Sequence, residues 1–230
     1  MERIILIETS TALCSVALAE DGAVTAYRES SAPKAHASLT AVFVQEVLAE
    51  RGVTLADCDA VCVSMGPGSY TGLRVGVSTA KGLCFGAGKP LLAVGTLDTL
   101  VAQAQSSSAE ENDGYRYIVP MIDARRMEVY AAVFENDKQI TETAPAIIDE
   151  TSYAEYLEQG PVLFIGDGAG KCADVIKHPN AHFCQCHPKA SLMLQPALEA
   201  YRMQDFKDVA YFEPFYLKEF VATVSKKKLF

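Results

Sequence analysis

A strand, a glycine turn and a helix in the first half of the chain most limit what it can fold into. Residues 60–65 form a largely apolar run of strand length, which Gly66-Pro67-Gly68 ends. Residues 71–85 then follow as a helix, with Ser69 or Thr71 as candidate N-caps. A buried strand that leads directly into a helix predicts an α/β fold.

Each half of the chain opens with a candidate β-hairpin and continues with alternating strands and helices. The hairpins pair 4–8 with 15–20 and 117–122 with 128–135. Between the halves, residues 106–114 are small and polar and have no periodicity, which makes them the best boundary. We therefore expect two related α/β lobes, an N-terminal lobe over 1–106 and a smaller C-terminal lobe over 115–230.

The composition is that of a globular protein, and its charge argues against one functional class. The 230 residues carry 29 acidic and 20 basic side chains, a formal net charge of -9, so the average field opposes a phosphate backbone. Autonomous binding of tRNA or DNA is therefore not expected. Seven scattered cysteines fit a reducing compartment rather than a disulfide framework. Because the sequence shows no signal peptide and no apolar run of membrane-spanning length, we expect a cytoplasmic protein.

Two helices of the first half carry faces suited to close packing. On the helix after Pro33, apolar residues at spacings of three and four form a stripe that contains Leu39, Phe43 and Val47. On the next helix, small residues recur every fourth position and leave one face nearly bare, at Gly72, Gly76 and Ala80, with Leu73 and Val77 beside them. Either the chain's own sheet or a partner helix packs against that face.

Two turns of the first half have the composition of an anion site. Gly66-Pro67-Gly68 precedes a helix N-terminus, where free amides and the helix dipole favour negative charge, although a tight turn also explains these glycines. The turn of the first hairpin contains Glu8, Thr9 and Ser10. A carboxylate followed by hydroxyls suits a magnesium ion with a phosphate, and it equally suits turn amides that need acceptors.

A third glycine turn lies in the second half. Gly166, Gly168 and Gly170 follow a strand and precede a helix, which is the setting of a nucleotide turn. Their spacing departs from the dinucleotide fingerprint, and no acidic residue follows about twenty positions later to hold a ribose.

The histidines and cysteines of the second half suggest zinc, but their spacing does not support it. The cluster consists of His178, His182, Cys184, Cys186 and His187. Pro179 disfavours a helix through the two histidines, and the two cysteines lack the usual two-residue gap. We therefore expect no metal site. No Gly-x-Ser-x-Gly elbow is present, so a serine hydrolase is not expected either.

Four motifs together resemble one protein family. They are Glu8-Thr9-Ser10-Thr11, the stretch 66–82 with Gly66-Pro67-Gly68-Ser69-Tyr70-Thr71-Gly72-Leu73-Arg74, Asp123-Ala124-Arg125-Arg126 and Pro214-Phe215-Tyr216-Leu217-Lys218. Along essentially its whole length the chain resembles the TsaB, or YeaZ, family of accessory proteins in bacterial tRNA threonylcarbamoyladenosine synthesis. The family's first motif usually begins with aspartate, where this chain has Glu8.

The resemblance implies both a fold and a role. The fold is that of the two-lobed actin, sugar-kinase and heat-shock-ATPase superfamily, with ribonuclease H-like lobes and a reduced second lobe. The role is that of a noncatalytic subunit, not an enzyme by itself, which binds TsaD as a heterodimer. With TsaE, the pair supports threonylcarbamoyl transfer to the adenosine beside the anticodon of tRNA, which this chain reaches only through the complex.

The resemblance also assigns a contact surface and the cofactors. The two first-half helices form the TsaD contact, so the expected partner-binding residues are those of the two faces above, Leu39, Phe43, Val47, Gly72, Leu73, Gly76, Val77 and Ala80. Without TsaD, the same surface is able to form a homodimer. In the catalytic relative, two histidines on a helix bind a metal ion, whereas this chain has His36 and Thr40 in the corresponding region. The resemblance therefore implies that ATP and a metal ion belong to partner subunits.

Two other hypotheses stay open at this level. A nucleotide-binding, ATPase-like protein would use the cleft between the lobes, with Glu8, Thr9, Ser10, Asp123 and the glycines at 166, 168 and 170. A glycoprotease-like metallopeptidase is the less favoured third hypothesis, because its metal ligands are poorly arranged.

Overall fold

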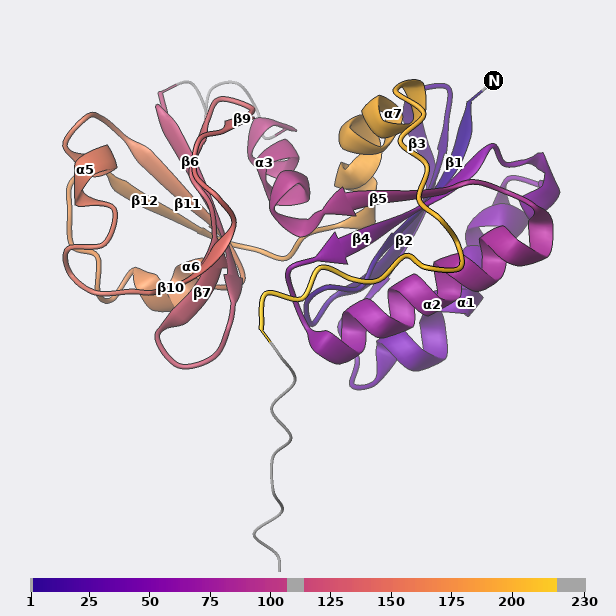
Figure 1. Ribbon diagram of the computed structural model, residues 1–230, viewed down its shortest axis with the longest axis horizontal. Coiled ribbons are helices and arrows are strands. Elements are labelled where there is room, and N and C mark those ends of the chain that lie inside the picture. Colours follow the sequence, from indigo (N-terminus) through magenta and orange to yellow (C-terminus); the bar gives the residue numbers. More distant parts are fainter. Residues whose placement is uncertain (1, 107–113, 219–230) are drawn as a thin grey trace, which may run out of the picture.

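The first lobe is built on a five-stranded sheet with the strand order β3-β2-β1-β4-β5 (Figure 1). The computed structural model describes residues 2–106 and 114–218. The strands of this sheet are β1 (Arg3–Glu8), β2 (Cys14–Glu20), β3 (Ala23–Ser30), β4 (Ala60–Gly66) and β5 (Leu91–Gly95). β1, β2 and β3 form an antiparallel meander, β4 runs parallel to β1, and β5 runs parallel to β4. The predicted hairpin is confirmed, and β3 extends it by a strand that the prediction lacked.

Helices cover both faces of this sheet, because successive side chains of a strand point to opposite sides. α1 (Ala35–Glu50) and α2 (Tyr70–Ala87) cover the face that receives Ile5 and Ile7 of β1. The other face receives Ile4 and Leu6, and it is covered by the 3-10 helix η2 (Ala190–Met193) and by α7 (Leu194–Arg202). A short 3-10 helix, η1 (Leu55–Asp57), lies between α1 and β4.

The second lobe contains a seven-stranded sheet whose main order is β10-β7-β6-β11-β12. Its strands are β6 (Tyr117–Asp123), β7 (Glu128–Ala131), β8 (Phe134–Glu135), β9 (Lys138–Gln139), β10 (Ala144–Ile147), β11 (Val162–Gly166) and β12 (Ala181–Gln185). The predicted hairpin is present, since β7 and β8 both pair antiparallel with β6. The helices that the structure describes in this lobe, α5 (Ala154–Leu157) and α6 (Ala169–Cys172), have four residues each, which agrees with a reduced lobe.

The helix α3 (Thr96–Ser106) lies between the two sheets (Figure 1). Leu97, Leu100, Val101 and Ala104 of α3 pack in one cluster with β6 and β11 of the second lobe. The opposite face of that sheet holds Phe164 and Leu157 in a separate cluster with α5 and α6. α3 also contacts β4, β5, η2 and α7 of the first lobe, so it packs against both lobes and fixes them against each other.

After β12 the chain returns to the first lobe, which differs from the expected division at residues 106 and 115. Met193, Ala197 and Leu198 are buried against the first sheet. Residues 205–218, which we call the C-terminal strap, then run along the first lobe toward the gap between the lobes (Figure 1). The strap is fixed by Lys81, whose Nζ donates to the carbonyls of Ala210 and Phe212, both at 3.0 Å. The second sheet is thus inserted between segments of the first lobe.

Two further expectations concern the chain's surroundings. All seven cysteines are free thiols. Among the helices that the structure describes, none combines the length and the apolar character needed to cross a membrane.

Candidate functional site

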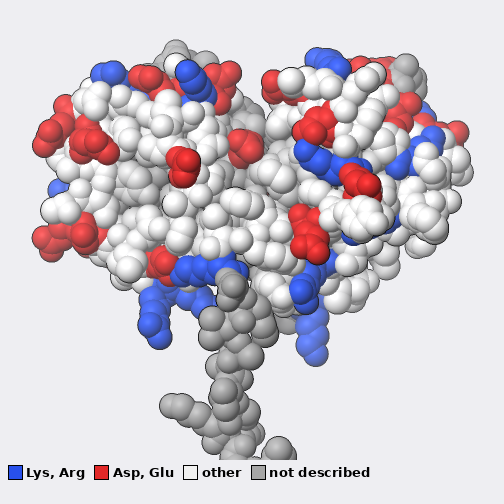
Figure 2. All heavy atoms as spheres, in the orientation of Figure 1, with Lys and Arg blue, Asp and Glu red and all other residues white. Residues whose placement is uncertain are grey.

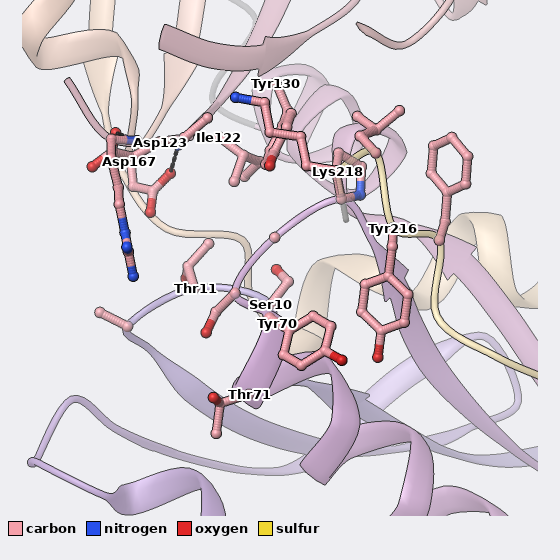
Figure 3. A pocket seen from close by; sticks show the side chains of 18 of the residues that line it. Ser10, Thr11, Tyr70, Thr71, Ile122, Asp123, Tyr130, Asp167, Tyr216 and Lys218 are labelled. Carbon is pink, nitrogen blue, oxygen red and sulfur yellow. Dashed lines mark hydrogen bonds between the residues drawn. The ribbon is translucent and has the colours of Figure 1, made fainter. Parts of the chain in front are cut away.

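A cavity of about 630 Å³ opens between the lobes, and it is the candidate site (Figure 3). One side is formed by the first-hairpin turn at 10–12 and by the start of α2 at 67–71. The other side is formed by 122–125, Tyr130 and Asp167, and the strap closes one end with 215–218. Segments that are far apart in sequence therefore meet around one space.

The first-hairpin turn forms a buried polar floor under this cavity. Glu8, Thr9 and Ser10 are fully buried, and Thr11 is nearly so. Glu8 Oε1 accepts a hydrogen bond from the Ser10 amide at 2.6 Å. Within residues 2–106 and 114–218, the hydroxyl oxygens of Thr9, Ser10 and Thr11 have no hydrogen-bond partner. A buried polar atom without a partner costs free energy, which makes these hydroxyls candidates for contact with a ligand in the cavity.

Burial also sets the charge of this floor. Loss of solvent raises the pKa of the Glu8 carboxyl above its ordinary value, and the hydrogen bond from Ser10 opposes that effect without cancelling it. Burial therefore disfavours the charged form of this carboxyl relative to an exposed glutamate. Of the two interpretations of this turn, the structure shows one contact that satisfies a turn amide, the bond from the Ser10 amide to Glu8.

The N-terminus of α2 forms the wall next to this floor. The Ser69 amide donates to the Ser10 carbonyl at 2.6 Å, and Ser69 Oγ caps the helix by accepting from the Gly72 amide at 3.3 Å. Because α2 has 18 residues, its first turn places a partial positive charge at the cavity. Of the two candidate N-caps, the structure selects Ser69.

The strap forms an aromatic wall. The Phe215 amide donates to the Met65 carbonyl at 2.7 Å, and Gly66, with φ at +108°, allows the Phe215 carbonyl to come close. Tyr216 then packs against Tyr70, with the two rings tilted by 37° and their centroids 4.8 Å apart (Figure 3). Arg74 lies 4.2 Å above the Tyr70 ring and donates to the Tyr216 hydroxyl at 3.2 Å.

The second lobe contributes charged residues to the opposite wall. The Asp123 amide donates to Asp167 Oδ1 at 2.9 Å, and Asp123 accepts from Lys171 Nζ. Burial raises the pKa of the Asp167 carboxyl above its ordinary value. Arg125 reaches the cavity from the β6–β7 turn, and Lys218 of the strap pairs with Glu128 across the lobes.

The expected partner-binding residues do not form an exposed surface, so that prediction is corrected. Phe43, Val47, Leu73, Val77 and Ala80 are buried, and Leu39 is half-buried against the same core. Their stripe faces the chain's own sheet, which was one of the two alternatives left open. The outward faces of α1 and α2 carry Val42 and Phe85 instead, 40% and 86% exposed.

The small residues of α2 serve the same internal packing. A Cβ on Gly72 would lie 2.1 Å from the Thr9 carbonyl oxygen, and a Cβ on Gly76 would lie 2.2 Å from Thr9 Oγ1. The first-hairpin turn of the same chain therefore packs against the bare face of α2. The absence of side chains at Gly72 and Gly76 allows Thr9 to approach the helix closely.

The second glycine turn is not an open phosphate cradle, which corrects the nucleotide residues proposed there. A Cβ on Gly166 would lie 2.2 Å from the Met121 carbonyl, and the Gly168 amide donates to that same carbonyl at 3.0 Å. The Gly170 amide donates to Gln185 Oε1 at 2.6 Å. These glycines let α6 approach β6. Of the proposed nucleotide residues, Ser10 and Asp123 line the cavity, and Glu8 and Thr9 lie beneath it.

The histidine and cysteine residues serve separate local roles. His178 Nδ1 accepts from the Asn180 amide at 3.2 Å, and His182 packs edge-on against Tyr115. Cys184 is exposed, and His187 lies 3.9 Å from Asp167. In the described part of the chain, no three His, Cys, Asp or Glu side chains come together as a metal site.

His36 also has a structural partner. Its Nε2 lies 2.8 Å from the Thr11 carbonyl, and Thr40 Oγ1 donates to the His36 carbonyl at 2.6 Å.

The cavity residues that were missed as site residues include Arg125, Tyr216 and Lys218. All three lie in the two motifs that carry the family resemblance without an assigned role. Their position in those motifs was the available signal.

The comparisons with known proteins agree with this architecture. A family model described as TsaD, tRNA N6-adenosine threonylcarbamoyltransferase, matches residues 29–224. The tRNA threonylcarbamoyladenosine biosynthesis protein TsaB of Escherichia coli is 32% identical over 228 residues, 96% of either chain, and the Bacillus subtilis TsaB is 32% identical over 71% of this chain and 70% of its own. The solved structure of YeaZ from Pseudomonas aeruginosa superposes with a TM-score of 0.79 at 27% identity, over 94% of this chain and 100% of the other. The chain therefore belongs to the TsaB, or YeaZ, family, whose members take part in tRNA threonylcarbamoyladenosine biosynthesis.

Proposed function

We propose that this chain is a noncatalytic subunit that binds TsaD and, with TsaE, supports threonylcarbamoyl transfer to the adenosine beside the anticodon of tRNA. The observation that carries the proposal is the likeness to Escherichia coli TsaB over 96% of both chains. The arrangement of His36 supports a noncatalytic role, because its ring nitrogen is engaged by the Thr11 carbonyl and its neighbour Thr40 bonds the backbone.

The TsaD contact is proposed for the outward faces of α1 and α2. The two helices lie side by side on one face of the first sheet (Figure 1). Their inward residues fill the core, so only the outward residues are available to a partner. Val42 on α1 and Phe85 on α2 are large apolar side chains exposed to solvent. Burial of such side chains is a common source of interface free energy, and in the absence of TsaD the same faces would pair two copies of the chain.

The test is co-elution of the purified chain with TsaD, combined with a threonylcarbamoylation assay that contains TsaD, TsaE and tRNA. The double variant Val42→Glu/Phe85→Glu should lose co-elution and modification activity while it keeps its fold, because both positions are exposed. The matched control is Ile147→Glu, which charges a side chain that is 78% exposed on β10 of the other lobe. Wild-type co-elution of the double variant would refute the assigned surface, and full modification activity without this chain would refute the function.

A second candidate function, nucleotide binding in the cleft, is favoured by one observation. Buried hydroxyls of Ser10 and Thr11, which find no partner among the described residues, lie beside the N-terminus of α2 at a cavity of about 630 Å³. Calorimetry with ATP and with AMP, with and without magnesium, tests it. Nucleotide binding in the cleft is supported if the wild type gives heat of binding that is lost in Ser10→Ala and kept in Ser78→Ala, a variant on the exposed side of α2. The absence of heat with either nucleotide would exclude nucleotide binding.

A further inference from the structure

The turn between β6 and β7 holds two consecutive arginines in an unfavourable backbone conformation. Arg125 and Arg126 have φ of 71° and 50°, the left-handed region. A side chain with a Cβ rarely occupies that region, and Asn-Gly is the usual sequence where a hairpin turn needs two such residues in succession. A strained turn that keeps two long cationic side chains points to a role for those side chains.

Surrounding hydrogen bonds make this turn rigid. The Arg125 amide donates to Asp123 Oδ1 at 2.8 Å, and the Glu128 amide donates to the Arg125 carbonyl at 3.2 Å. From α6, Lys171 Nζ donates to the carbonyls of Arg126 and Glu128 at 2.7 and 2.6 Å. Hydrogen bonds from Asp123, Glu128 and Lys171 therefore fix the backbone of the turn, and this backbone sets the position from which the two arginine side chains extend.

Neither arginine has an acidic partner within the residues that the structure describes. Asp123 pairs with Lys171, Glu128 pairs with Lys218, and Asp167 accepts from the Asp123 amide. The nearby carboxylates are thus already bonded to other groups. Both arginines are exposed, and Figure 2 shows several basic side chains along the lower edge of the molecule, with acidic side chains near them. On a chain with a net charge of -9, this edge is locally suited to an anion.

The two arginines differ in where they lie. Arg125 lines the cavity between the lobes, whereas Arg126 is exposed outside the set of lining residues. A single small ligand in the cavity would use the first arginine only. A strand with successive phosphates is able to use both, because each planar guanidinium binds one phosphate through two parallel hydrogen bonds.

We propose that the Arg125–Arg126 turn is a phosphate-binding site that contacts the backbone of an RNA bound by the complex of this chain with TsaD. The choice of RNA rests on the proposed function, while the phosphate chemistry rests on the turn itself. The turn supplies affinity without reading sequence, since phosphate contacts position a nucleic acid but do not specify it.

The test removes both charges with the sequence that the turn conformation prefers. Arg125→Asn/Arg126→Gly should fold at least as well as the wild type, with an unchanged or higher melting temperature, because it relieves the left-handed strain. Lys138→Asn/Arg202→Asn is the matched control, since it removes two positive charges on β9 and α7, at the other end of the lobes (Figure 1). Binding of substrate tRNA to each complex with TsaD is then measured between 50 and 200 mM salt.

A plot of log affinity against log salt concentration has a negative slope. Loss of two phosphate contacts should make this slope shallower by about 1.4 to 1.8 for the turn variant and leave the slope of the control unchanged. An unchanged slope and affinity in the turn variant would overturn the proposal. So would a loss confined to calorimetric binding of AMP or ATP, which would assign the turn to a free nucleotide. Failure of the wild type to co-elute with TsaD would count against the proposed function alone, and the same comparison with the isolated chain at low salt would still decide on the turn.

Discussion

Three glycines on α2 allow a graded test of how the first-hairpin turn is held against that helix. At Gly72 an added Cβ would lie 2.1 Å from the Thr9 carbonyl oxygen, so backbone must move by more than about 1 Å to reach ordinary contact. At Gly76 the nearest atom, at 2.2 Å, is Thr9 Oγ1, which a side-chain rotation is able to withdraw. At Gly82 no atom lies within 4 Å. The three positions thus share one helix and differ only in what stands opposite.

Replacement of each glycine by alanine gains about 1 kcal/mol of helix propensity, so the contacts decide the sign. Gly82→Ala should raise the free energy of unfolding by about 0.5 to 1 kcal/mol. Gly72→Ala should lower it by roughly 2 kcal/mol, because a forced contact in a packed region costs about 1 to 3 kcal/mol or more. Gly76→Ala should fall between them. The span of roughly 3 kcal/mol corresponds to a change of about a hundredfold in the folding equilibrium constant.

Urea unfolding of the three variants, followed by circular dichroism, measures these differences from the shift in midpoint at constant slope. Equal stability of Gly72→Ala and Gly82→Ala would show that the turn does not press on the helix as described. The same result would restore the bare face of α2 as a surface for a partner.

Three further predictions concern charge and the strap. Hydrogen bonds from Thr25 and Arg3 hold the pKa of Glu20 at about 2, below the ordinary 4.5. The stability that the Glu20 carboxylate contributes is therefore complete above pH 4.5 and is lost as the pH falls toward 2. In urea titrations, Glu20→Gln should be less stable than the wild type at about pH 7 and equally stable near pH 2. Burial raises the pKa of the Glu8 carboxyl, so the wild type should lose stability as the pH rises above 4.5. Glu8→Gln should abolish that loss between about pH 5 and pH 8. An equal loss of stability in the variant would contradict a raised pKa for Glu8. Lys81→Met should release the strap and speed its cleavage in limited proteolysis, whereas Lys138→Met, at an exposed position, should not.

The sequence predicted the regular elements well where a period of apolar residues was strong. The strands of the first hairpin, β4 and the two helices α1 and α2 lie close to where they were expected. β3 was missed because Arg28, Glu29 and Ser30 dilute its alternation. The strap was not predictable from periodicity, since it has no regular hydrogen-bond pattern and is held by Lys81 and by the Met65 carbonyl.

The candidate site could be predicted only in part, because pattern does not tell which surface a face meets. The stripe with Phe43 and Val47 is real, but an apolar face packs on its own sheet as readily as on a partner. Spacing likewise does not reveal that the glycine turn at Gly168 faces the Met121 carbonyl. Arg125 and Tyr216 enter the cavity through tertiary folding that brings residues about ninety positions apart together.

The return of the chain to the first lobe has a consequence for the order of folding during synthesis. The second sheet is encoded by one continuous segment, and its strands end at Gln185. The first sheet lacks the cover on one face until Met193, Ala197 and Leu198 have been made. Because domains fold from the N-terminus as they emerge, a nascent chain completes its second lobe first. Until residues 190–198 have been made, the side chains of β1 and β4 on that face have no cover from η2 and α7.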